Sequence, residues 1–204
     1  MKIKFKEINF FNEPFPHITS KTDICLNYKL IKDLIASTSP DQFRVTNNVD
    51  FQKKELRNDS GLLGDLLGAI QTDEIKKVCE DSFGIKNLIS DPNFDGGGLT
   101  ITELNGYLRY HNDFPYSSEV NAYRVINTLL YLSDSELEGG DLHLLDPISL
   151  TVEKIIKLEF GLFVAFPTSK NTPHGFSRIK KGKRIGINSY FYSDSPLDER
   201  TEPS

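Results

Sequence analysis

This sequence is poor in cysteine, in positive charge and in long apolar runs. Its 204 residues include two cysteines, Cys25 and Cys79, and carry a formal net charge of −5. Because both cysteines lie in helix-like patterns, we expect buried free thiols in a reducing compartment, although one disulfide is conceivable. An acidic chain without a basic cluster predicts neither a nucleic-acid partner nor a membrane partner. Nothing approaches a transmembrane segment, so we expect a cytoplasmic protein.

The sequence also shows no secretory leader, internal repeat or domain linker. The first ten residues alternate lysine with apolar residues, which is typical of a strand and not of a signal peptide. With 38% hydrophobic and 26% charged residues, the chain can bury a hydrophobic core. We expect residues 1–204 to form one domain, and the composition says nothing of its oligomeric state.

Helix patterns, with interruptions, dominate the first third of the chain, after a short opening strand that ends at two prolines. The helical spacing of apolar residues predicts three helices, over residues 24–35, 62–70 and 72–83. Between them, residues 37–60 are polar and without periodicity, which predicts an exposed loop or a substrate lid. We therefore expect helical support over about residues 20–95.

From residue 96 onward the pattern changes to short strands separated by glycines. We predict strands over residues 99–104, 107–114, 123–132, 141–145, 162–166 and 185–192. The strand over 123–132 is almost entirely apolar, which predicts burial on both faces. Helices followed by a run of strands favour an α+β fold, with helices packed on a β core over about 96–193. A flexible tail is expected over 194–204.

Four residues form the most informative chemical pattern. His111 and Asp113 lie two apart in a predicted strand, so both side chains project from one face and can hold one ion together. His174 follows much later, in a Pro-His-Gly segment. Two histidines and one carboxylate form the facial triad of non-haem Fe(II) oxygenases, which leaves metal positions open. Arg184 comes at strand-like distance after His174, where its guanidinium can bind a carboxylate.

A His-x-Asp triplet also occurs on solvated strands, which is the simpler interpretation. Two features favour a metal site. The strand that carries His111 is otherwise apolar or aromatic in character, and the apolar run over 161–167 places His174 at the rim of a barrel, where loops carry chemistry. Of the other two histidines, His143 alternates with apolar residues and His17 lies in a proline turn. We expect both to face solvent and neither to bind metal.

These motifs resemble the 2-oxoglutarate- and Fe(II)-dependent oxygenases, nearest to the prolyl 4-hydroxylase-like branch. The resemblance covers about residues 98–192. A series of segments in matching order carries it: residues 105–113, 124–133, 138–142, 161–167, 173–176 and 182–192. The resemblance implies a double-stranded β-helix, or jelly roll, braced by the N-terminal helices.

Carried over residue by residue, the resemblance implies that His111, Asp113 and His174 bind Fe(II). It implies that Arg184 pairs with the distal carboxylate of 2-oxoglutarate. Tyr131 matches a tyrosine that hydrogen-bonds the same carboxylate, although a core aromatic on a buried strand would look the same.

Other positions match less closely. Arg124 matches a position that helps to place the substrate, although a salt bridge at the start of a strand would look identical in sequence. Thr102 or Glu103 stands where the family often has a tyrosine, and Gly186 stands where some relatives have a serine. Asn188 is expected to compensate with a hydrogen bond to the cosubstrate.

The resemblance implies a hydroxylase that uses Fe(II), 2-oxoglutarate and O2, and that converts 2-oxoglutarate to succinate and CO2. Asp113 favours hydroxylation, because halogenating relatives replace this carboxylate with a small residue. We expect a peptidyl substrate, with a prolyl residue as its target, or alternatively a free amino acid or another small metabolite. By strand alternation Tyr107 and Arg109 share a face with His111, so we expect both to face the substrate.

Two rival interpretations belong to other classes of protein. A non-catalytic jelly-roll binding protein would have kept the barrel and lost turnover, but drift would usually erase a metal ligand first. A cupin-like metal protein would not use 2-oxoglutarate and would not need Arg184. It therefore predicts that Arg184→Ala leaves the activity intact.

Overall fold

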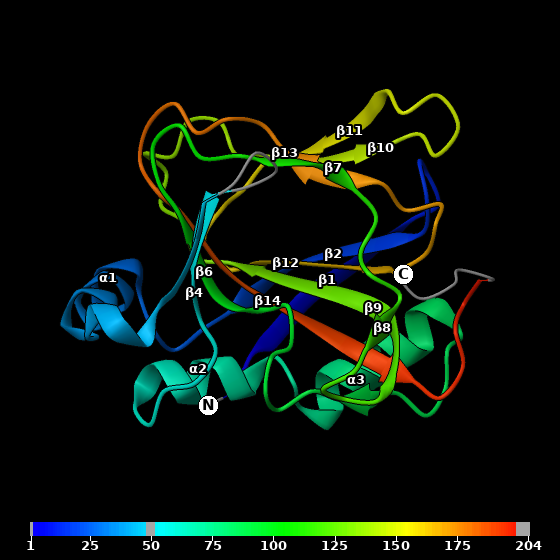
Figure 1. Ribbon diagram of the computed structural model, residues 1–204, viewed down its shortest axis with the longest axis horizontal. Helices are drawn as coiled ribbons and strands as arrows, with labels where there is room; N and C mark the ends of the chain where they lie inside the picture. Colours follow the sequence, from blue (N-terminus) through cyan, green and yellow to red (C-terminus); the bar gives the residue numbers. More distant parts are fainter. Residues whose placement is uncertain (1, 48–51, 199–204) are drawn as a thin grey trace.

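The computed structural model describes residues 2–47 and 52–198, in which two antiparallel sheets face each other (Figure 1). The smaller sheet has the strand order β11 (Val152–Ile156), β10 (Leu142–Leu145), β13 (His174–Phe176) and β7 (Leu108–His111). The larger sheet has the order β1 (Lys4–Phe11), β2 (His17–Asp23), β12 (Leu162–Pro167), β9 (Ala122–Tyr131), β14 (Arg184–Ser193), β6 (Gly98–Thr102), β4 (Gln52–Leu56) and β3 (Arg44–Asn47). Short strands β5 (Ile89–Ser90) and β8 (Tyr116–Ser117) pair with β14 and β9. Two facing antiparallel sheets are the architecture of a jelly roll, as predicted.

Alternation along β9 places two hydrophobic cores on the two faces of the larger sheet. Leu130 packs in the core on the outer face, whereas Leu129 and Tyr131 pack in the core between the sheets. Almost every residue of β9 is buried, which confirms that this strand has no solvent-facing side.

Helices cover the outer face of the larger sheet. They are α1 (Tyr28–Ser37), α2 (Leu62–Ala69) and α3 (Asp73–Phe83), with one 3-10 turn over Pro40–Gln42. In Figure 1, α2 and α3 lie beneath the larger sheet, and Leu66 and Ile75 from them are fully buried in the outer core. Thr72 caps the start of α3, and Gly84 ends it with a positive φ of 72°. Within the described residues, no helix is long and apolar enough to cross a membrane.

The prediction of a loop over residues 37–60 was wrong. Its described part contains the last residue of α1, the 3-10 turn and a β3–β4 hairpin, and β4 extends the larger sheet by pairing with β6. Residues 48–51 lie outside the described part. The predicted helical support over 20–95 was therefore only partly helical, and strands of the larger sheet begin at Lys4, well before residue 96.

Smaller corrections concern burial. His17 was expected in a solvent-facing turn, but it opens β2 and is fully buried, stacked on Phe11 with ring centroids 5.0 Å apart. Cys25 precedes α1 and is exposed, whereas Cys79 is buried within α3, and both are free thiols.

Strand β11 was not predicted. Of the predicted flexible tail, residues 199–204 lie outside the described residues.

Candidate metal centre and cosubstrate pocket

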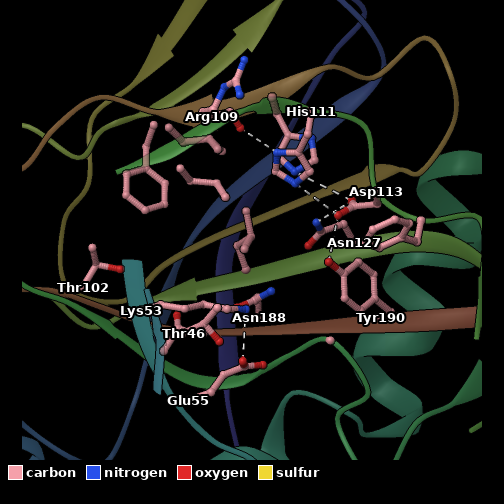
Figure 2. A pocket seen from close by; sticks show the side chains of 18 of the residues that line it. Thr46, Lys53, Glu55, Thr102, Arg109, His111, Asp113, Asn127, Asn188 and Tyr190 are labelled. Carbon is pink, nitrogen blue, oxygen red and sulfur yellow. Dashed lines mark hydrogen bonds and ion pairs between the residues drawn. The ribbon is translucent and has the colours of Figure 1, made fainter. Parts of the chain in front are cut away.

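A cavity of about 720 Å³ lies between the two sheets. Residues from both sheets line it, including β7, β10 and β13 of the smaller sheet and β4, β6, β9 and β14 of the larger one. Figure 2 shows this cavity with the predicted metal ligands on one side and β4 on the other.

The three predicted metal ligands meet at one end of the cavity. His111 ends β7, Asp113 follows two residues later, and His174 opens β13. Antiparallel pairing of β13 with β7 puts His174 directly opposite His111, which joins residues far apart in the sequence. The potential ligand atoms of all three lie within 4.8 Å of one another. The Nε2 atoms of His111 and His174 are 3.7 and 3.8 Å from the Asp113 carboxylate oxygens.

Backbone carbonyls fix the orientation of both imidazoles. The Nδ1 of His111 lies 2.9 Å from the Arg109 carbonyl, and the Nδ1 of His174 lies 3.0 Å from the Thr172 carbonyl. Because a carbonyl can only accept a hydrogen bond, each Nδ1 carries the proton and each Nε2 keeps its lone pair for a metal. Burial lowers the pKa of His174 to about 4, which keeps this ring neutral.

Two donors from the larger sheet hold Asp113. The amide nitrogen of Asn127 donates to Oδ2 and the hydroxyl of Tyr190 donates to Oδ1, each at 2.9 Å (Figure 2). Burial alone would raise the pKa of Asp113, but the neighbouring imidazoles of His174 and His111 and the Asn127 hydrogen bond hold it well below its usual range. The carboxylate is therefore ionised and oriented toward the two imidazoles.

Sequence reasoning missed Asn127 and Tyr190. They face each other in the register of β9 and β14, which is not visible in the sequence. The one available signal was Asn127 itself, an amide inside an otherwise apolar strand. A buried amide needs hydrogen-bond partners, so its presence there indicates a polar site.

Arg184 provides a buried cation in the same cavity. It is 7% exposed, its Nε donates to the Gly140 carbonyl at 3.0 Å, and a terminal nitrogen donates to the Tyr131 hydroxyl at 3.2 Å. The guanidinium carbon lies 4.0 Å from the centroid of the Phe176 ring. Among the described residues, no carboxylate lies within ion-pair distance of this guanidinium. A buried cation in this position fits an anionic ligand.

The other predicted site residues have different placements. Asn188 lines the cavity from β14. Arg124 also lines it, but its guanidinium is paired with Asp95 at 2.8 Å, so the salt bridge weighed from the sequence is present. Arg109 lines the cavity and is exposed. Tyr107 does not line it, because β7 begins one residue later and the Arg178 guanidinium lies over its ring at 4.7 Å.

The donor set fits a non-haem iron site. Imidazole nitrogen and carboxylate oxygen are ligands that suit Fe(II), and three protein ligands leave positions open for a cosubstrate and O2. The open side of the triad faces the cavity that Arg184 also lines. A metal site and a buried cation in the lining of one cavity suit a ligand with two acidic ends.

Comparison with known proteins agrees with this chemistry. Residues 91–192 match the model of the 2OG-Fe(II) oxygenase superfamily, half of the chain. Human prolyl 3-hydroxylase 3 is 37% identical over 65 residues, which are 32% of this chain but only 9% of that protein. The match thus spans about a tenth of that relative's length.

Solved structures share the fold. A Pseudomonas putida prolyl-4-hydroxylase superposes with a TM-score of 0.60 at 16% identity, covering 87% of this chain and 93% of that one. A Trichoplax adhaerens prolyl hydroxylase in complex with a hypoxia inducible factor peptide fragment superposes with a TM-score of 0.58 at 16% identity, covering 80% and 75%. At these identities the likeness establishes the jelly-roll fold alone.

Proposed function

This chain belongs to the 2OG-Fe(II) oxygenase superfamily, the dioxygenases that use Fe(II), 2-oxoglutarate and O2, and we propose that it hydroxylates an unactivated C–H bond of a peptidyl substrate, with a prolyl residue as its target. The observation that carries the proposal is the joint placement of His111, Asp113, His174 and Arg184 around one cavity. When bound, Fe(II) and 2-oxoglutarate supply oxidation: one atom of O2 enters the substrate C–H bond, the other enters succinate, and CO2 is released.

The protein's own residues fix the geometry of this reaction. His111, Asp113 and His174 hold the iron, and the donors Asn127 and Tyr190 keep the carboxylate of Asp113 from rotating. Such a fixed ligand set keeps the remaining metal positions pointed into the cavity.

Arg184 and Tyr131 hold the distal carboxylate of 2-oxoglutarate. The two side chains are already hydrogen-bonded to each other, so the anion enters a site that is arranged in advance. Apolar side chains of Leu129, Leu142 and Phe176 line the same part of the cavity and exclude water, which strengthens the ion pair. Asn188 lines the cavity as a further donor for the cosubstrate.

The substrate class has its own support. The structural relatives named above are prolyl hydroxylases, and one of them holds a peptide. The cavity volume leaves space for a peptide residue beside the cosubstrate. A free amino acid or another small metabolite is the alternative substrate. The observation that favours it is the set of charged side chains that β3 and β4 contribute to the cavity, since such side chains bind small polar molecules.

An anaerobic titration with Fe(II) and 2-oxoglutarate tests the proposal. We expect a visible charge-transfer band from the chelated 2-oxo acid, and its loss in His111→Ala. His143→Ala is the matched control, because His143 lies on the same sheet but hydrogen-bonds Tyr110 and not the triad. The band should persist in that variant. Iron binding without a band would favour a cupin-like protein, and no iron binding would contradict the assigned site.

Succinate formation then separates the substrate classes. Proline-containing peptides should stimulate succinate release above the rate without substrate, with hydroxyproline appearing in equal amount. Stimulation by a free amino acid and by no peptide would replace the peptidyl substrate with the small-molecule alternative.

A further inference from the structure

One side of the cavity is entirely polar. The side chains that the β3–β4 hairpin and the residue after it contribute are Arg44, Thr46, Lys53, Glu55 and Arg57. We call this set the hairpin wall. Figure 2 shows its members Thr46, Lys53 and Glu55 across the cavity from the metal ligands. A polar wall opposite a reactive centre indicates recognition of a polar group on the substrate.

The register of the hairpin makes this wall. Arg44 pairs with Glu55, and Thr46 pairs with Lys53, so these four side chains share one face. Lys54 projects from the opposite face of β4 and pairs with Glu103 at 3.4 Å. The hairpin therefore has a cavity side, which carries Lys53, and an outer side, which carries Lys54.

Glu55 organises the basic side chains of the wall. Its side chain is 3% exposed, with Lys53 Nζ at 3.3 Å and Arg57 Nε at 3.7 Å from its two oxygens. The oxygen nearest Arg57 is buried and has no hydrogen-bond partner among the described residues. Glu55 orients the cationic groups of Lys53 and Arg57.

Basic side chains outnumber carboxylates among the described residues that line the cavity. The lining contains six basic side chains, Arg44, Lys53, Arg57, Arg109, Arg124 and Arg184, and two carboxylates, Glu55 and Asp113, in a chain whose net charge is −5. Arg184 is assigned to 2-oxoglutarate, and Asp95 offsets Arg124. Asp95 and Glu119 each lie 3.8 Å from a terminal nitrogen of Arg57 and offset part of its charge. Exposed Arg44 has no carboxylate within ion-pair distance among the described residues.

We propose that the hairpin wall binds an anionic group of the substrate, a carboxylate, and so directs the carbon to be hydroxylated toward the metal. The inference rests on the proposed function, whose substrate it narrows to an acidic one. The carboxylate belongs either to an acidic side chain of a peptide or to a small dicarboxylic acid or amino acid. A carboxylate accepts several N–H donors at once, which suits a wall that presents two arginines and a lysine.

Binding measured without turnover tests the inference. Protein loaded anaerobically with Fe(II) and 2-oxoglutarate is titrated with fluorescein-labelled octapeptide pools that have a fixed proline. The pools differ only in carrying aspartate and glutamate, their amides, or lysine and arginine. We expect the acidic pool to bind at least about tenfold more tightly than the basic pool by fluorescence polarisation.

Matched variants locate the effect. Arg44→Gln should reduce the preference for the acidic pool several-fold, whereas Lys54→Gln, on the outer side of the hairpin, should preserve it. Calorimetric titration with glutarate, L-glutamate and L-proline forms the small-molecule arm. Tight binding of the first two with none of the acidic pool would identify a small acid as the source of the carboxylate.

Two kinds of contrary result distinguish failure of the anion site from failure of the oxygenase assignment. Equal binding of the acidic and basic peptide pools together with equal binding of L-glutamate and L-proline, or equal effects of Arg44→Gln and Lys54→Gln, would overturn the anion site. The charge-transfer band reports the proposed function independently. A normal band without anion preference removes only this inference, and an absent band removes the oxygenase assignment, while anion preference is still measurable in the same protein.

Discussion

At the metal end of the cavity each ligand side chain has a short hydrogen bond to a second group, whereas on the hairpin wall the charges face one another at longer range. His111, His174 and Asp113 are held by partners at 2.9 to 3.0 Å. Lys53 and Arg57 stand 3.3 and 3.7 Å from Glu55, with about a quarter of each side chain exposed. The difference matches two tasks: a metal needs one fixed geometry, and a variable substrate group needs donors that can adjust.

The largest expected effect of a substitution lies at the metal end. His174→Ala should abolish Fe(II) binding, because His111 and Asp113 alone leave one ligand position unfilled in a buried site. Arg44→Gln on the hairpin wall should leave Fe(II) affinity unchanged. Calorimetric titration of each apo-protein with Fe(II), with circular dichroism to verify folding, measures this contrast. Unchanged iron affinity in a folded His174→Ala variant would remove His174 from the ligand set.

Arg184 lines the same cavity but belongs to neither region, and it should affect the cosubstrate alone. Arg184→Met removes the charge-assisted hydrogen bonding to 2-oxoglutarate, and since one such bond is worth about 1.5–3 kcal/mol, the affinity for 2-oxoglutarate should fall at least roughly 10- to 100-fold. Fe(II) affinity should stay the same. The half-saturation point of the charge-transfer band measures the first quantity, and calorimetry measures the second.

Lys183→Met is the control for this prediction, since Lys183 is the preceding residue but is exposed and pairs with Glu103 at 3.0 Å. It should leave both affinities unchanged. If Arg184→Met also had no effect on 2-oxoglutarate affinity, the cupin-like interpretation would regain support.

The hydrogen bonds around Asp113 should have a smaller effect. Tyr190→Phe removes the donor to Oδ1 and keeps the ring, so the carboxylate gains freedom and Fe(II) affinity should fall about tenfold. Tyr192→Phe is the matched control on the same strand, because the Tyr192 hydroxyl donates to Asp91 and does not contact Asp113. Competition with a coloured chelator measures both. Equal losses in the two variants would mean that general packing, and not the orientation of Asp113, sets the affinity.

The metal end could be predicted from the sequence because its signals are local or chemically rare. His111 and Asp113 share a face through the two-residue period of a strand, and His174 follows a recognisable buried strand. The cross-strand register that joins the two histidines could not be predicted, since antiparallel pairing brings together segments more than 60 residues apart. For the same reason the partnership of Asn127 and Tyr190 was not found.

The hairpin wall escaped prediction for a different physical reason. Strand β4 reads Gln-Lys-Lys-Glu-Leu, without the apolar alternation that marks a strand, because its inner face lines a polar cavity and not a core. Alternation indicates a strand only where one face packs against apolar side chains. Its polar sequence was therefore interpreted as a loop, and the hairpin was left out of the predicted β core.

The smallest expected effect lies on the hairpin wall and tests whether the two regions are independent. Glu55→Gln keeps the shape of the side chain and removes a negative charge beside Lys53 and Arg57. Losing a charge that offsets these two cations should make the acidic peptide pool bind roughly two- to fivefold more tightly, which is about 0.4–1 kcal/mol. Fe(II) and 2-oxoglutarate affinities should not change, because Glu55 contacts none of the metal ligands nor Arg184.

Weaker binding of the acidic pool would show that Glu55 positions the cations more than it opposes the anion. A changed iron affinity would show that the hairpin wall and the metal end are energetically coupled across the cavity.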